Sequence, residues 1–162
     1  MLTTILNLLE VAAWSGIAAL GFGILFNIPK GAIFTIFVLG FTAGLIKFGL
    51  IYFDIHIVLA TFIAVFIIGI ICIPMAHIIH QPPVVFCIPP VIPMIPGYFA
   101  YETVLSVMNF IFMEDNPVKK VELIDAIFTN GFTMFFILIS ISIGISLPML
   151  ILRKNSVKRI EK

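Results

Sequence analysis

Charged side chains are scarce in this sequence. Lys, Arg, Asp and Glu together make up 10% of its 162 residues, whereas about a quarter of the residues of a soluble domain are charged. Hydrophobic residues reach 62%, and the net charge of +1 comes with no basic cluster of the kind that binds nucleic acid. This composition excludes an ordinary soluble domain and predicts an all-α, polytopic integral membrane protein.

Residues typical of catalytic and metal sites are also few. The sequence has no H-E-x-x-H, no G-x-S-x-G, no phosphate-binding glycine loop and no pair of intramembrane aspartates. Its two cysteines, Cys72 and Cys87, lie in apolar surroundings, which favours free buried thiols over a disulfide or a metal site. His77 and His80 would share a helix face, but no third ligand is near in sequence. We therefore predict no enzymatic activity, no metal and no cofactor.

Five apolar stretches are long enough to cross a hydrocarbon core of about 30 Å. We predict transmembrane helices over about 3–26, 32–53, 57–74, 84–113 and 123–152, which form one transmembrane domain. Gly40 and Gly44 give the second span a small-xxx-small face for helix packing. Asn27 and Pro29 predict a structural turn after the first span, because proline disfavours helix in the residue before it.

The basic residues predict an orientation. The tail at 153–162 holds five of the nine Lys and Arg residues, so we expect it to be cytoplasmic. Five spans then place the N-terminus outside and the Lys30 turn inside, which agrees with the rule. Lys119 and Lys120 fall on the outside, which is a mild conflict.

The fourth span is interrupted by prolines. Residues 88–102 contain Pro89, Pro90, Pro93 and Pro96, and each proline removes a backbone donor and clashes with the carbonyl four residues before it. We expect regular helix only from Pro96 or Gly97 onward. Irregular backbone at membrane depth is tolerated where it is buried in protein or lines a cavity. The fourth span is therefore predicted to be broken and to form part of a solute pathway.

Residues at and after this break are the candidate site. A helix that begins at Gly97 offers free N–H groups and the positive end of its dipole, which suit a carboxylate solute. Tyr101 can add a hydroxyl donor. Glu102 lies roughly 16 Å deep, where it either exchanges protons or stays neutral and bonds a neighbouring span. Asn130 either lines the pathway or makes an interhelical hydrogen bond.

Two further charges lie inside spans. Glu10 is roughly 10 Å and Lys47 roughly 9 Å from the outer boundary, so we hypothesise an ion pair between neighbouring antiparallel helices. In the alternative, Lys47 snorkels outward and Glu10 faces a partner or is protonated. A second alternative concerns the whole chain: a structural or assembly subunit without a solute pathway explains the low charge content, but not Glu102 beside a broken span.

Three segments carry a resemblance to a known family. They are GFGILFNIPKG, VIPMIPGYFAY and FTNGFTMFFILISISIGISLP, and the most specific piece is Pro93-Met94-Ile95-Pro96-Gly97. In this order, from about Gly21 to Lys154, they resemble the short subunit of the threonine/serine exporter family. Asn27, Pro29 and Asn130 match the family pattern, whereas Glu10 and Glu102 do not.

The resemblance implies a function. It implies a subunit of an exporter in the bacterial cytoplasmic (inner) membrane, which acts with a larger membrane subunit and is linked to the proton motive force. The implied substrates are threonine and serine or, for the separate short type, succinate; this chain leans towards the dicarboxylate. The lipid bilayer, a small carboxylate or amino acid, the larger subunit and further copies of this chain are the expected partners.

Overall fold

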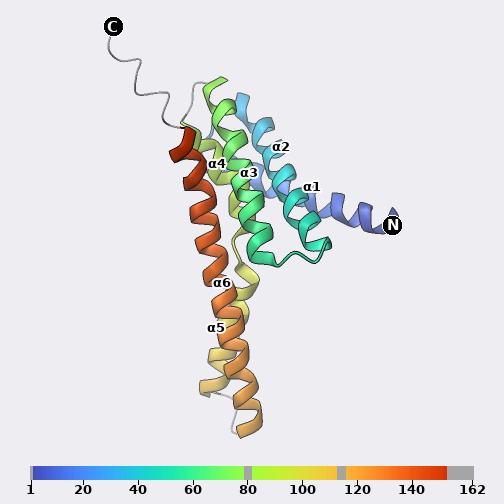
Figure 1. Cartoon of the computed structure of the whole chain (residues 1–162), viewed down its shortest axis with the longest axis vertical. Helices are drawn as coiled ribbons and strands as arrows, with labels where there is room; N and C mark the ends of the chain where they lie inside the picture. The colour runs from blue at the N-terminus through green and yellow to red at the C-terminus, as the bar shows by residue number, and fades with distance from the viewer. Residues whose placement is uncertain (1, 79–81, 113–115, 153–162) are drawn as a thin grey trace. The chain divides into compact units, whose positions relative to one another are not determined.

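The computed structural model describes residues 2–78, 82–112 and 116–152, and every regular element in these ranges is helical (Figure 1). This confirms the predicted all-α fold. The predicted basic tail at 153–162 and His80 lie outside the described residues. The α-helices are α1 (Leu2–Leu25), α2 (Ile33–Tyr52), α3 (Ile57–Ile78), α4 (Pro83–Val91), α5 (Gly97–Phe112) and α6 (Pro117–Leu152), and the short 3₁₀ helices are η1 (Lys30–Ala32) and η2 (Ile92–Met94).

Four helices of the described ranges are long and apolar enough to cross a membrane. They are Thr3–Leu25, Lys30–Tyr52, Ile57–Ile78 and Pro117–Leu152. A fifth span results if the interrupted pair Val85–Met94 and Gly97–Phe112 counts as one. The predicted polytopic membrane architecture, with a broken fourth span, is therefore confirmed.

The proline-rich segment is more helical than we predicted. The new helix does begin at Gly97, but the residues before it are not irregular: α4 includes Pro89 and Pro90, and η2 continues it to Met94. Proline has a φ near −65°, which a helix also has, so the backbone can stay helical at Pro89 and Pro90 although each lacks an N–H donor. The break is thereby confined to Ile95 and Pro96.

Backbone contacts divide the chain into two compact units. Unit 1 contains the chain up to Met94 together with α6 from Ser140 onward. Unit 2 contains Ile95–Ile139, which is α5 and the first part of α6.

In unit 1, α1 and α2 are antiparallel helices that pack through small residues (Figure 1). The predicted packing face of α2 does face a neighbour. A Cβ atom at Gly40 would overlap the Cβ atom of Ala19, and one at Gly44 would lie 2.7 Å from Ser15 Cβ and 3.2 Å from Ala12 Cα. The glycines therefore allow the two backbones to approach closely.

A second close seam in unit 1 joins α3 to the end of α6. A Cβ atom at Gly69 would lie 2.9 Å from Pro148 Cγ, and one at Gly144 would lie 3.0 Å from Val65 Cγ1. From the contact of Val65 with Gly144 to that of Gly69 with Pro148, the residue number increases in both helices, so the two helices run parallel. Pro148 is fully buried in this seam.

The two turns that follow α1 and α2 have the same form. Asn27 and Asp54 adopt left-handed conformations, with φ of 54° and 59°. After α1, the Asn27 N–H donates to Ile24 O at 2.9 Å and the Ile28 N–H donates to Gly23 O at 3.1 Å, which is the Schellman pattern. After α2, Asp54 and Ile55 repeat it. Asn and Asp tolerate this conformation better than other non-glycine residues.

Unit 2 is a pair of antiparallel helices. Thr103 of α5 packs against Gly131 of α6, where an added Cβ atom would lie 3.6 Å from Thr103 Cγ2. Nearer the connection, Lys120 Nζ lies 5.9 Å from the centre of the Phe110 ring. These two contacts fix the register of the pair.

Candidate functional site

The start of α5 offers fewer free donors than its sequence suggests. Pro96 has no N–H, and the Gly97 N–H already donates to Ile95 O at 2.8 Å. The Ala100 N–H closes the first helical turn on Pro96 O at 3.1 Å. The N–H groups of Tyr98 and Phe99 have no hydrogen bond to another described residue. They are the donors that this helix start presents, beside the exposed Gly97.

Glu102 and Asn130 lie at one level of unit 2. Thr103, which follows Glu102, contacts Gly131, which follows Asn130, so the two side chains differ in height by no more than about one or two residue rises of 1.5 Å. Both are half-buried, and no hydrogen bond or ion pair within the described ranges involves either side chain. The Thr103 hydroxyl is different, because it donates to Phe99 O of its own helix at 2.6 Å.

The remaining predicted residues of unit 2 are less enclosed. The Tyr101 side chain is 63% exposed, and no described hydrogen bond involves its hydroxyl. Pro96 is buried, whereas Pro93 belongs to unit 1, where it is half-buried within η2. Unit 2 therefore brings together Gly97, Tyr101, Glu102 and Asn130 on one helix pair, without a direct bond among their side chains.

The structure does not bring Glu10 and Lys47 together as an ion pair. Glu10 is exposed on α1, whereas the Lys47 side chain is only 8% exposed and its Nζ donates to Met94 O at 3.4 Å. The same ammonium lies 5.7 Å from the centre of the Phe48 ring. Lys47 therefore contacts the end of η2 instead of an acidic side chain.

Two polar features of unit 1 were missed in the sequence. The Lys47–Met94 contact joins residues that are 47 positions apart in the sequence. The one feature of the sequence that could have indicated it is the proline-rich break, because carbonyls beside such a break lack N–H partners. Thr61 is of a residue type whose hydroxyl can bond the backbone of its own helix. Its hydroxyl is instead fully buried, with no hydrogen-bond partner among the described residues.

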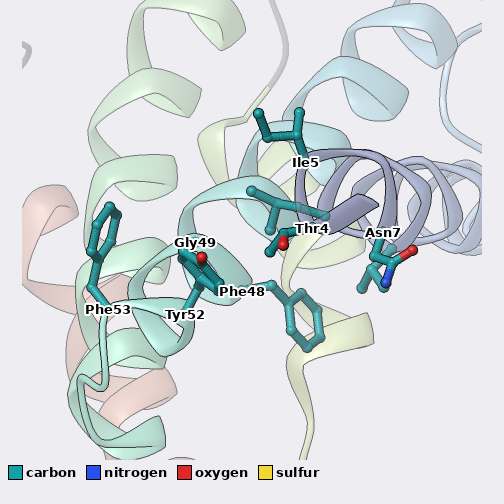
Figure 2. A pocket seen from close by; sticks show the side chains of 9 residues that line it. Thr4, Ile5, Asn7, Phe48, Gly49, Tyr52 and Phe53 are labelled. Atoms are coloured by element: carbon teal, nitrogen blue, oxygen red, sulfur yellow. The ribbon is translucent and has the colours of Figure 1, made fainter. Parts of the chain in front are cut away.

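An open apolar pocket of about 380 Å³ lies between the first turns of α1 and the end of α2 (Figure 2). Figure 2 shows aromatic side chains from the end of α2 and the side chains of Thr4, Ile5 and Asn7 from α1 around it. Thr4, Asn7 and Tyr52 are the lining residues with polar side-chain groups and the rest of the lining is apolar, so the pocket suits an apolar chain better than a carboxylate. It is lined by Thr4, Ile5, Asn7, Leu8, Val11, Phe48, Gly49, Tyr52 and Phe53.

The described residues contain no group of three His, Cys, Asp or Glu side chains that can hold a metal ion. Cys72 of α3 and Cys87 of α4 are free and buried, as predicted.

The comparison with known proteins decides the family. A family model described as Threonine/Serine exporter, ThrE, matches residues 11–151. The chain belongs to the threonine/serine exporter family. An uncharacterised protein of Haemophilus influenzae is 30% identical over 150 residues, which cover 90% of this chain and 48% of that protein. The chain thus spans about half the length of this curated relative. No solved structure matches the chain.

Family membership agrees with the helical architecture. This member of the threonine/serine exporter family is a multi-pass membrane protein, with four or five helices in the described ranges that can cross a bilayer. The family is one of transporters, and its match extends over α1 to α6. The resemblance carried by the three sequence segments is confirmed.

Proposed function

We propose that this chain is a subunit of a secondary transporter that exports small carboxylates across the bacterial cytoplasmic membrane. The family match over residues 11–151 carries the proposal. The interruption between η2 and α5 supports it, because discontinuous helices form solute sites in several transporter folds. The substrates are succinate, or threonine and serine, all of which carry a carboxylate.

A larger membrane subunit completes the exporter in this proposal. Two observations support it: the chain corresponds to about half of its Haemophilus influenzae relative, and α6 exposes a series of large aromatic side chains. Lipid tails, the larger subunit or further copies of this chain would cover these side chains. They are Phe128, Phe132, Phe135 and Phe136.

The proposed orientation places the N-terminus outside and the basic C-terminal tail in the cytoplasm. It follows from the distribution of Lys and Arg, which favours the cytoplasmic side. Lys30, which is exposed in η1, then lies at the cytoplasmic surface.

In unit 2, we assign solute binding and proton coupling to different residues. The start of α5 at Gly97 meets the solute carboxylate, and Tyr101 and Asn130 supply further hydrogen-bonding groups. Glu102 serves as the proton site that links export to the proton motive force. Pro93 and Pro96 maintain the break, because neither can donate the N–H that would continue the helix.

Efflux measurements test this function. Cells that contain the larger subunit are compared with and without this chain, and the release of labelled succinate and threonine is followed. We expect efflux of one of these solutes to depend on the chain. Equal efflux in both cell types, with the larger subunit still active, would favour the alternative of a structural or assembly subunit.

A comparison of two glycine variants tests whether the start of α5 belongs to the pathway. An added Cβ atom meets nothing within 4 Å at either Gly97 or Gly21, so Gly97→Ala and Gly21→Ala are both compatible with the fold. We expect Gly97→Ala to lower efflux, because its methyl group narrows the approach to the free N–H groups, and Gly21→Ala to leave efflux unchanged. Equal efflux in the two variants at equal abundance would remove Gly97 from the pathway.

A further inference from the structure

Lys47 of α2 is a buried charged side chain. Its side chain is 8% exposed, and no carboxylate of the described residues forms an ion pair with it. The acidic residues in the described part of unit 1, Glu10 and Asp54, are both exposed. Ionisable side chains inside a membrane span usually face an interior or a water-filled cavity, and they commonly mark the path of a solute or ion.

The direction of the Lys47 side chain follows from the helix that carries it. Side chains lean toward the N-terminus of their helix, and α2 runs outward in the proposed orientation. Lys47 therefore leans from a backbone roughly 9 Å below the outer surface toward the middle of the bilayer. Its ammonium reaches Met94 O, the last carbonyl of η2 before the break. Outward snorkelling is not what the side chain does here.

The contact with Met94 leaves the ammonium incompletely satisfied. The distance of 3.4 Å is longer than the usual 2.7–3.2 Å of an N–H···O hydrogen bond. A lysine ammonium has three N–H donors, and the described residues supply this one acceptor and the face of Phe48. A carboxylate oxygen makes a shorter, charge-assisted bond of about 2.7–2.9 Å to an ammonium.

We propose that the Lys47 ammonium, held beside the Met94 carbonyl at the end of η2, is the group in unit 1 that binds the carboxylate of the exported solute. The proposal rests on the proposed export function and names the counter-charge that function needs. The solute supplies the anion that the described residues do not place there. When no solute is bound, the carbonyl of Met94 holds the ammonium in position. This site requires a carboxylate, which succinate, threonine and serine all carry. A solute with a single carboxylate would meet the start of α5 and Lys47 at different steps of its passage.

Vesicles that contain the full chain with the larger subunit test the site by measuring KM and maximal rate for labelled succinate and threonine. Lys47→Gln keeps a hydrogen-bond donor for Met94 without the charge, Lys47→Met removes both, and Lys47→Arg keeps the charge. Lys30→Met is the matched control, because Lys30 is an exposed lysine outside the site. We expect KM to rise at least tenfold in both neutral variants, to change less than threefold in Lys47→Arg, and to stay unchanged in Lys30→Met.

A structural role for Lys47 gives a different pattern. If the lysine only caps η2, Lys47→Gln keeps the wild-type KM, and Lys47→Met lowers the amount of folded protein while the remaining molecules keep their KM. An unchanged KM in either neutral variant overturns the proposal, and so does failure of both neutral variants to fold. Wild-type vesicles that transport neither solute would instead refute the proposed function, so the two failures are distinguishable.

Discussion

The seam between α1 and α2 predicts a sharp difference between two glycines of one helix. Gly40 and Gly49 both lie in α2, but of the two only Gly40 is in close contact with α1. A Cβ atom at Gly40 would overlap Ala19 Cβ and would lie 3.0 Å from Ser15 O and 3.2 Å from Gly16 Cα. A Cβ atom at Gly49 meets nothing within 4 Å. We therefore expect Gly40→Ala to destabilise the protein and Gly49→Ala to leave it intact or stabilise it.

The size of the effect follows from two opposing terms. Alanine is better than glycine inside a helix by roughly 0.5–1 kcal/mol, and this gain applies at both positions. Forcing a methyl group into a packed interface costs about 1–3 kcal/mol, and this cost applies only at Gly40. Two of its obstacles are backbone atoms, which move only if the helices separate. The free energies of unfolding of the two variants should thus differ by about 2 kcal/mol.

Reversible unfolding in mixed detergent micelles measures this difference, with helix content from circular dichroism as the signal. A double variant sharpens the test: Ala19→Gly removes the overlapping methyl group, so Gly40→Ala should cost less in its presence than alone. Rescue should be partial, because Ser15 O and Gly16 Cα remain. Equal stability of Gly40→Ala and Gly49→Ala would refute the close seam.

Three further predictions concern single side chains. Glu102→Gln should abolish proton-driven net efflux but retain solute exchange. Glu122→Gln, an exposed control on α6, should change neither. If net efflux and its pH dependence are the same in the two variants, Glu102 carries no protons. Thr61→Val should leave the free energy of unfolding unchanged or raise it by about 1 kcal/mol, because the Thr61 hydroxyl has no partner among the described residues. If thermal unfolding instead shows that the free energy of unfolding falls by about 1 kcal/mol, the hydroxyl makes a hydrogen bond. Asn27→Ala should lower the free energy of unfolding by about 1–2 kcal/mol because of its positive φ, whereas Asn27→Gly should not; equal values would contradict the left-handed turn.

The apolar runs identify most of the helices because a membrane helix is specified locally. About twenty apolar residues and a polar connection suffice, and tertiary contacts are not needed to infer the span. The packing face of Gly40 and Gly44 was also predictable, since its spacing places both residues on one side of α2. The same spacing could not show which helix lies opposite, because that depends on the fold of the whole chain.

Two interpretations from the sequence differ from the structure, each for its own reason. The proline rule predicts loss of hydrogen bonds correctly, but it overstates the loss of helix at Pro89 and Pro90, which are fully buried within α4. Depth alone suggested that Lys47 meets Glu10, because both lie at similar distances from one surface. Depth does not say around which side of a helix a residue lies, and Lys47 turns toward η2 instead.

The break and the buried lysine are best understood as one arrangement. The break at Ile95 and Pro96 interrupts the helical hydrogen bonds, and Met94 O receives no bond from the Tyr98 N–H, its partner in a continuous α-helix. Hydrocarbon supplies no water to replace them, and an ammonium in the same medium lacks hydration too. Lys47 Nζ and Met94 O each provide what the other lacks, so the cost of placing both at membrane depth is smaller than the sum of the two separate costs. The bond is long at 3.4 Å, so the ammonium can still accept a closer anionic partner, and in our proposal the carboxylate of the exported solute is that partner.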